Sequence, residues 1–118
     1  MRKKKFKGRC EKRLLSKCEG VFRSYDILQS KYADMLVTDP DVKSFQCNVL
    51  MDGLEIGEYT SDFVCTRVDG TVFIRECTYR KNLTRAQTIN LLSASQKYWY
   101  ARGIYDWKLV IDAQDDDQ

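Results

Sequence analysis

The sequence predicts a single α/β domain with the element order helix, three strands, helix, strand. The dipeptide Asp69-Gly70 separates two runs rich in β-branched and aromatic residues, which is the strongest short-range signal for a β-hairpin. Helical apolar patterns lie before and after this hairpin, and a short apolar run, residues 107–111, follows the second helix. With 118 residues, 43% of them hydrophobic, the chain can form one core but not two.

The first predicted element is a helix from about Glu19 to Leu36, ended by Asp39-Pro40 because the residue before a proline avoids the α conformation. Gln29 lies inside the apolar stripe of this helix, and Asp26 lies at its flank. A buried amide without a partner costs about 1–3 kcal/mol, so a polar group is expected to face Gln29 across the core. The stripe consists of Val21, Phe22, Tyr25, Leu28, Tyr32, Met35 and Leu36.

Three strands are expected next. Residues 42–51 form the first, a tight turn follows at Asp52-Gly53, residues 54–68 continue as extended chain, and residues 71–79 form the partner strand of the hairpin. Together they predict an antiparallel meander of at least three strands.

The second helix is predicted to begin at a cap provided by Asn82 or Thr84 and to run to about Arg102, with Gly103 in the left-handed terminating position. The apolar run at residues 107–111 is then expected to rejoin the sheet beside the hairpin as a buried strand. The predicted core face of this helix consists of Thr84, Thr88, Leu91, Leu92, Ser95, Tyr98 and Trp99.

Composition excludes several classes of chemistry. The chain has no histidine, which excludes Ser-His and Cys-His catalysis and leaves carboxylates, lysines or a hard metal ion to carry any reaction. The five cysteines are odd in number and include no C-x-x-C pair, so buried thiols are expected. No run reaches the roughly 18 apolar residues of a membrane span, and no signal segment follows the basic N-terminus. The sequence therefore predicts a soluble, cytoplasmic protein with no membrane partner.

Charge divides the chain into three parts: a basic arm at residues 1–18, a domain at residues 19–112 and an acidic tail at residues 113–118. Residues 1–17 contain nine Lys or Arg and a single acid. Such a cluster is typical of a salt-dependent phosphate-binding arm, and it is equally typical of a solvated terminus that only aids solubility. The candidate DNA contacts of the arm are Lys3, Lys4, Lys5, Lys7 and Arg9.

The hairpin carries one carboxylate on each strand, Asp62 and Glu76, and its register decides whether they meet. A two-residue turn at Asp69-Gly70 puts Asp62 opposite Cys77. A three-residue loop with Gly70 as the left-handed bulge residue puts Asp62 opposite Glu76.

Two opposed carboxylates destabilise a sheet unless a cation lies between them. The bulged register therefore predicts a divalent metal site at Asp62 and Glu76, with Mg²⁺ as the expected ion because the ligands are hard oxygens. Along the second strand, Glu76, Thr78 and Arg80 are expected to share a face. The other interpretation is that the two acids lie at an edge and never meet.

Three segments then resemble a known family: Asp39-Pro40-Asp41-Val42-Lys43-Ser44-Phe45, Tyr59-Thr60-Ser61-Asp62-Phe63 and Tyr98-Trp99-Tyr100-Ala101-Arg102-Gly103. Together with the element order, they resemble the P-D-(D/E)-x-K nuclease superfamily and, more narrowly, the N-terminal catalytic domain of TnsA-type transposon endonucleases. The resemblance covers about residues 22–111. It implies a restriction-endonuclease-like αβββαβ core, with a mixed central sheet flanked by helices, and cleavage of DNA phosphodiester bonds that depends on Mg²⁺ or Mn²⁺.

The resemblance implies that Asp62 and Glu76 bind the metal. Two family residues are missing: Thr78 stands where the family has its lysine, and Gln29 stands where it has a helix glutamate. Asp26 is a possible substitute for that glutamate, and Arg80 or Lys81 for the lysine. The candidate catalytic residues are thus Asp62, Glu76, Thr78, Gln29, Asp26 and Arg80.

Two functional hypotheses follow. The first is a TnsA-like, metal-dependent DNA endonuclease domain. The second is a nuclease fold that has lost catalysis and serves as a DNA-binding or protein-binding subunit of a mobile-element or phage system, with a transposase or another protein subunit as partner. In both, Lys81 and Arg85 are further candidate DNA contacts.

Overall fold

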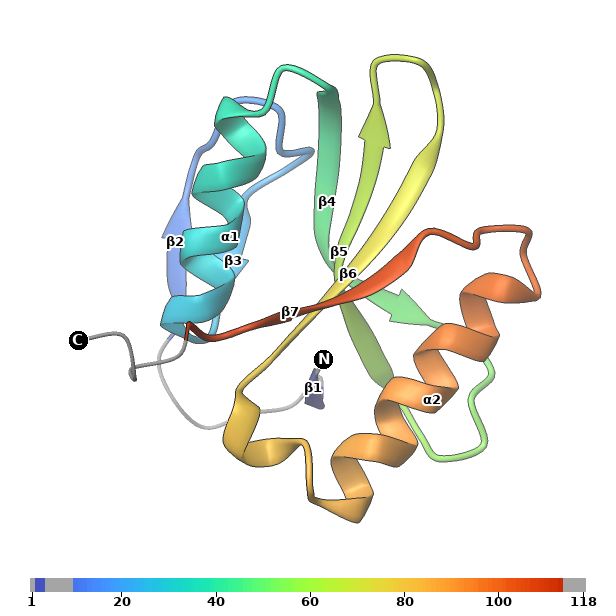
Figure 1. The fold of residues 1–118 in the computed structure, drawn as a ribbon. Coiled ribbons are helices and arrows are strands. Elements are labelled where there is room, and N and C mark those ends of the chain that lie inside the picture. Colours follow the sequence, from blue (N-terminus) through green and yellow to red (C-terminus); the bar gives the residue numbers. More distant parts are fainter. Residues whose placement is uncertain (1, 4–9, 114–118) are drawn as a thin grey trace.

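The computed structural model describes residues 2–3 and 10–113, and side chains from residue 10 onward (Figure 1). The protein is a mixed α/β structure, and the predicted order helix, three strands, helix, strand is confirmed for α1 to β7. Short strands precede it. The elements are β1 (Arg2–Lys3), β2 (Glu11–Arg13), β3 (Phe22–Ser24), α1 (Ile27–Thr38), β4 (Val42–Met51), β5 (Tyr59–Arg67), β6 (Val72–Thr78), the 3₁₀ turn η1 (Arg80–Asn82), α2 (Ala86–Tyr100) and β7 (Trp107–Ile111).

Strand β5 is the centre of the main sheet. It pairs antiparallel with β4 on one side and with β6 and β1 on the other, and β7 joins β6 in parallel, as predicted for the last strand. Strands β2 and β3 form a separate antiparallel pair. Within the described residues, neither helix has the length and apolar character needed to cross a membrane.

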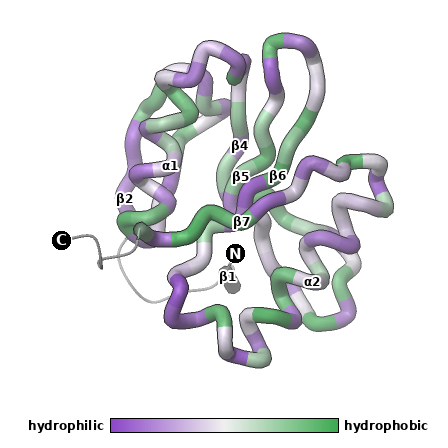
Figure 2. The backbone as a smooth tube through the Cα atoms, viewed as in Figure 1, coloured by the Kyte–Doolittle hydropathy of each residue, from purple (hydrophilic) through white to green (hydrophobic). Residues whose placement is uncertain are grey.

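Two apolar clusters form the core, one beside each helix. The α1 cluster centres on Phe63, whose ring lies 5.3–6.2 Å from the rings of Phe22, Tyr32 and Phe45. The α2 cluster contains Met51, Tyr59, Ile74 and Trp99. Both helices alternate between hydrophobic and hydrophilic positions, as expected of helices that bury one face (Figure 2).

The hairpin has the bulged register. Its pairs run from Phe63 with Arg75 to Thr66 with Val72. The Arg67 N–H donates to the Thr71 carbonyl at 2.8 Å, and Gly70 has a φ of 91°, the left-handed conformation that glycine adopts at least cost. The prediction of a three-residue loop is confirmed, and the two-residue turn is excluded.

The first helix was predicted too long at its start. Residues 22–24 form β3 instead, and α1 begins at Ile27 with Asp26 as its N-cap, whose carboxylate accepts the Gln29 N–H at 2.8 Å. Val21 and Met35 of the predicted stripe are 41% and 63% exposed, and the buried helix residues are Gln29, Ala33 and Leu36. Pairing of β3 with β2 outweighs the helical periodicity of this segment.

The second helix also begins later than predicted, at Ala86. Its N-cap position is held by Arg85 without a side-chain cap, so neither Asn82 nor Thr84 caps it; Asn82 belongs to η1. Gly103 has a φ of 82°, which confirms its predicted left-handed conformation after the helix.

The ends of the chain lie partly outside the described residues. Lys4, Lys5, Lys7 and Arg9 of the predicted DNA-binding arm are outside them, and so are residues 114–118 of the acidic tail. Lys3 is described by its backbone alone, in β1, which pairs with Thr60 and Tyr59 of β5.

Candidate functional site

The structure brings Asp62 and Glu76 together in the interior. Continuing the hairpin register by one step pairs the two residues, and their side chains are only 1% and 0% exposed. The Asp62 N–H donates to Glu76 Oε1 at 2.8 Å, and the Cys77 N–H donates to Asp62 Oδ2 at 2.7 Å. The two carboxylates thus accept backbone hydrogens at the point where β5 and β6 separate. We call this point the fork, defined by Asp62, Glu76 and Cys77.

An irregularity in the neighbouring strand accompanies the fork. Asn48 in β4 has a φ of 53°, unusual for a residue other than glycine, and it lies between the pairs Cys47 with Phe63 and Val49 with Ser61. Cys47 and Phe63 belong to the α1 cluster, whereas Val49 packs in the α2 cluster. The two strands therefore change the side to which they contribute apolar residues, and Asp62 lies at this change.

Gln29 reaches the fork from α1. Its Nε2 donates to Asp62 Oδ1 at 2.9 Å and lies 3.3 Å from Asn48 Oδ1, while its Oε1 accepts the Tyr25 N–H at 2.8 Å. Gln29 is 1% exposed. The prediction that a polar group faces Gln29 across the core is therefore confirmed, and this group includes the predicted metal ligand Asp62.

Ser95 reaches the fork from α2. Its hydroxyl donates to Glu76 Oε2 at 2.5 Å and accepts the indole N–H of Trp107 at 2.9 Å. The sequence indicated Ser95 only as a small core residue, and its role was missed. A signal was present, since a buried indole N–H requires an acceptor and the chain has two tryptophans close to this region. The other, Trp99, donates to Ser61 at 2.8 Å.

Burial dominates the electrostatics of Glu76. Loss of hydration, together with the nearby charge of Asp62, raises the pKa of Glu76 to about 7, while the hydrogen bonds from Ser95 and from the Asp62 N–H oppose this shift. A carboxylate with a near-neutral pKa is suited to accept and release protons near physiological pH. Burial also raises the pKa of the neighbouring Cys77 thiol, so this cysteine stays protonated and is not a nucleophile.

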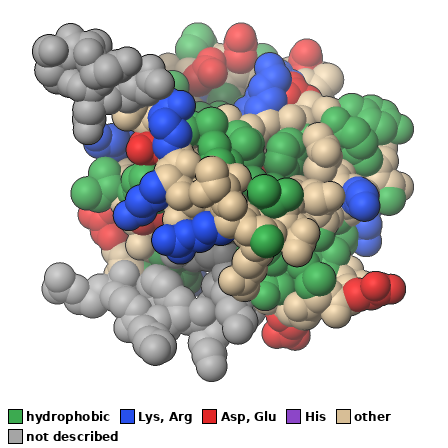
Figure 3. All heavy atoms as spheres, turned by 60° about the horizontal axis from the view of Figure 1, so that its bottom comes forward, with side chains coloured by type: hydrophobic (Ala, Val, Ile, Leu, Met, Phe, Trp, Pro, Cys, Tyr) green, Lys and Arg blue, Asp and Glu red, His purple; other side chains and the backbone are tan. Residues whose placement is uncertain are grey.

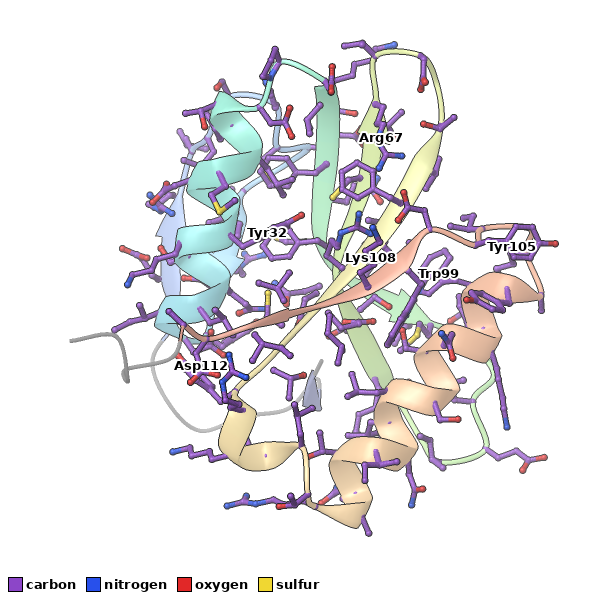
Figure 4. All side chains as sticks on the ribbon, viewed as in Figure 1. Tyr32, Arg67, Trp99, Tyr105, Lys108 and Asp112 are labelled. Carbon is purple, nitrogen blue, oxygen red and sulfur yellow. The ribbon has the colours of Figure 1, made fainter. Side chains whose placement is uncertain are left out.

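The remaining predicted catalytic residues do not join the carboxylates through the contacts seen here. Thr78 is buried at the end of β6, beside Ile111 of β7. Because β6 ends at Thr78, the strand periodicity does not extend to Arg80, and the prediction of a face shared with Glu76 is wrong for Arg80. The Arg80 N–H donates to Asp112 Oδ1 at 2.6 Å, and its guanidinium donates to the Asp112 carbonyl at 3.0 Å; Figure 4 labels Asp112 at the end of β7. Asp26 remains one step removed, as the cap that holds the Gln29 N–H.

The carboxylates fit a hard divalent ion with few protein ligands. Each of the four oxygens of Asp62 and Glu76 accepts one hydrogen bond, which leaves lone pairs for coordination. Mg²⁺ is commonly held by one or two carboxylates and several waters. A third acidic, histidine or cysteine ligand close enough to complete a cluster is absent from the described part of the chain. Gln29 presents its NH₂ group, not its oxygen, to Asp62.

Comparisons with known proteins leave the site itself as the guide to function. A scan against models of protein families found no match to this sequence, and a search of curated proteins also found none.

Proposed function

We propose that the protein is a TnsA-like, metal-dependent DNA endonuclease domain that acts on phosphodiester bonds. The observation that carries the proposal is the juxtaposition of Asp62 and Glu76 at the fork, produced by the Gly70 bulge. The order α1, β4, β5, β6, α2, β7 and the parallel addition of β7 to an antiparallel hairpin agree with a restriction-endonuclease-like core.

In this proposal, Asp62 and Glu76 hold Mg²⁺ or Mn²⁺. Such an ion supplies a water of lowered pKa and neutralises charge that develops on the phosphate. Gln29 keeps Asp62 oriented through the bond to Oδ1, and Glu76, with its raised pKa, can take up a proton released near the pair.

DNA contact is assigned to exposed cations near η1 and the start of α2. Lys81 and Arg85 are both exposed there, and they carry no hydrogen bond or ion pair among the described side-chain contacts. Figure 3 brings this end of the molecule forward and shows Lys and Arg side chains gathered on one side of it. Their role would be sequence-independent binding of phosphates, which weakens as salt rises.

A second candidate function is supported by two residues of the site. Gln29 donates a hydrogen bond to Asp62 where the family has a carboxylate, and Thr78 brings no charge where the family has a lysine. Both differences fit a nuclease fold that has lost catalysis and serves as a DNA-binding or protein-binding subunit, alongside a transposase or another protein of a mobile-element or phage assembly.

Nicking of supercoiled plasmid tests the enzyme directly. We expect the wild-type protein to nick plasmid with Mg²⁺ or Mn²⁺, and we expect Asp62→Asn and Glu76→Gln to abolish nicking while remaining folded. Glu58→Gln, which changes an exposed carboxylate before β5, is the matched control and should keep full activity. No nicking with either metal would overturn the enzyme proposal.

Restoring the two missing family residues separates the candidates. In the degenerate subunit, the double variant Gln29→Glu, Thr78→Lys should gain metal-dependent nicking that the wild-type protein lacks. A double variant that folds, binds DNA and still fails to nick would mean that the site differs from the family in more than these two positions.

A further inference from the structure

Ser95 lies between an indole donor and a buried carboxylate. Its side chain is fully buried, with Trp107 Nε1 at 2.9 Å and Glu76 Oε2 at 2.5 Å from Oγ. The three residues come from α2, β7 and β6. The hydroxyl therefore joins the three elements at one carboxylate oxygen.

The direction of this chain of hydrogen bonds is fixed by the chemistry of its ends. An indole N–H can only donate, and an ionised carboxylate can only accept. Trp107 thus occupies a lone pair of the Ser95 hydroxyl and turns its single proton toward Glu76. The nearby Ser61 hydroxyl lies 3.5 Å from Ser95 Oγ, but it accepts from Trp99 and contacts Met51 Sδ at 3.2 Å.

Glu76 is consequently held at both oxygens. Oε2 is bound by Ser95, and Oε1 is bound by the Asp62 N–H at 2.8 Å. Two donors on opposite oxygens fix the plane of a carboxylate, and a hydrogen bond to a charged group is about twice as strong as one between neutral groups. Loss of the Ser95 donor leaves Glu76 free to rotate away from Asp62.

We infer that Ser95, oriented by Trp107, is a positioning residue that holds the Glu76 carboxylate against Asp62 in the geometry of the acid pair. Its consequence for metal binding rests on the proposed function, whereas the position of Glu76 does not. Groups that orient a metal ligand typically change metal affinity by 10–100-fold when they are removed.

The Asp62 amide reports the position of Glu76 without any metal or substrate. In ¹H–¹⁵N spectra of the metal-free protein, Ser95→Ala should shift the Asp62 amide proton upfield and speed its hydrogen exchange about tenfold, as expected when one charge-assisted bond is lost. The Cys77 amide, which is bound by Asp62 Oδ2, should keep its shift. Ser93→Ala, on the exposed side of the same helix, is the matched control and should change neither amide.

Two further measurements keep the inference testable if Ser95→Ala unfolds. Trp107→Phe retains Ser95 and removes only the orienting N–H, so it should move the Asp62 amide in the same direction by less. Mn²⁺ titration should then show affinity lowered at least tenfold in Ser95→Ala and unchanged in Ser93→Ala. An unmoved Asp62 amide in both folded variants would overturn the inference. Wild-type protein that binds no Mn²⁺ would instead count against the proposed function and would leave the amide result to decide the role of Ser95.

Discussion

The two halves of β5 follow different rules. Residues 63–67 form a regular ladder with β4 and β6, and their side chains alternate between the α1 cluster and the α2 side. Residues 59–62 have lost β6 as a neighbour, and β1 pairs with Thr60 and Tyr59 instead (Figure 1). At Asp62, side-chain carboxylates take backbone hydrogens that a continuous ladder would have paired.

The difference separates what stabilises the fold from what is available for chemistry. The regular half buries aromatic rings around Phe63, which favours folding through apolar burial. The fork buries two acids, which costs free energy unless hydrogen bonds or a cation offset it. A folded protein keeps such an arrangement when every buried polar group has a partner, as Gln29 and Ser95 illustrate.

The largest effect is expected in the regular half. Phe63→Ala removes a fully buried ring that contacts three other rings, and it should lower the free energy of unfolding by about 3–5 kcal/mol. Urea unfolding followed by fluorescence measures this loss. Val68→Ala, at a position that is 63% exposed, is the control and should change stability by less than about 0.5 kcal/mol. Equal losses in the two variants would contradict the assigned core.

The fork, in contrast, should make stability depend on pH. The pKa of Glu76 is raised from its ordinary value of 4.5 to about 7, so the folded protein holds a proton that the unfolded chain has released. The stability contributed by this proton is complete below pH 4.5 and is lost as pH rises through 7, a change of roughly 3 kcal/mol at 1.4 kcal/mol per unit. Unfolding measured from pH 4 to pH 8 in metal-free buffer should show this fall in wild type and not in Glu76→Gln. The same slope in both proteins would assign the titration to another group.

Gln29→Ala should have a smaller effect at the fork. The change removes the donor to Asp62 Oδ1 and the acceptor of the Tyr25 N–H, and we expect a loss of about 1–3 kcal/mol in unfolding free energy. Gln46→Ala is the matched control, because the Gln46 amide also makes a hydrogen bond, to Glu19 at 2.9 Å, but lies on the surface. If the two alanine variants lose the same stability, burial of the Gln29 amide is not what gives it weight.

Local sequence signals predicted the regular parts of the fold. The bounds of β4 and β7 agree with the prediction at both ends, and the hairpin register followed from the requirement for a left-handed residue at Gly70. The polar position of Gln29 within an apolar stripe also predicted correctly that a buried partner exists. Each of these signals lies within one element or one turn.

Features that depend on contacts between distant segments were not visible in this way. The start of α1 was misplaced because pairing of β3 with β2 overrides the helical periodicity of residues 22–24. The left-handed conformation of Asn48 and the bond from Ser95 to Glu76 depend on how β4, α2 and β7 meet at the fork. Neither residue type announces such a role, since serine is common on helix faces that pack closely.

Calorimetric titration with Mg²⁺ tests most directly the claim that the fork is a metal-binding site. We predict one binding event in the wild-type protein, its loss in both Asp62→Asn and Glu76→Gln, and its retention in Glu58→Gln. Binding that survives in both fork variants, or no binding by wild-type protein with either Mg²⁺ or Mn²⁺, would contradict the account.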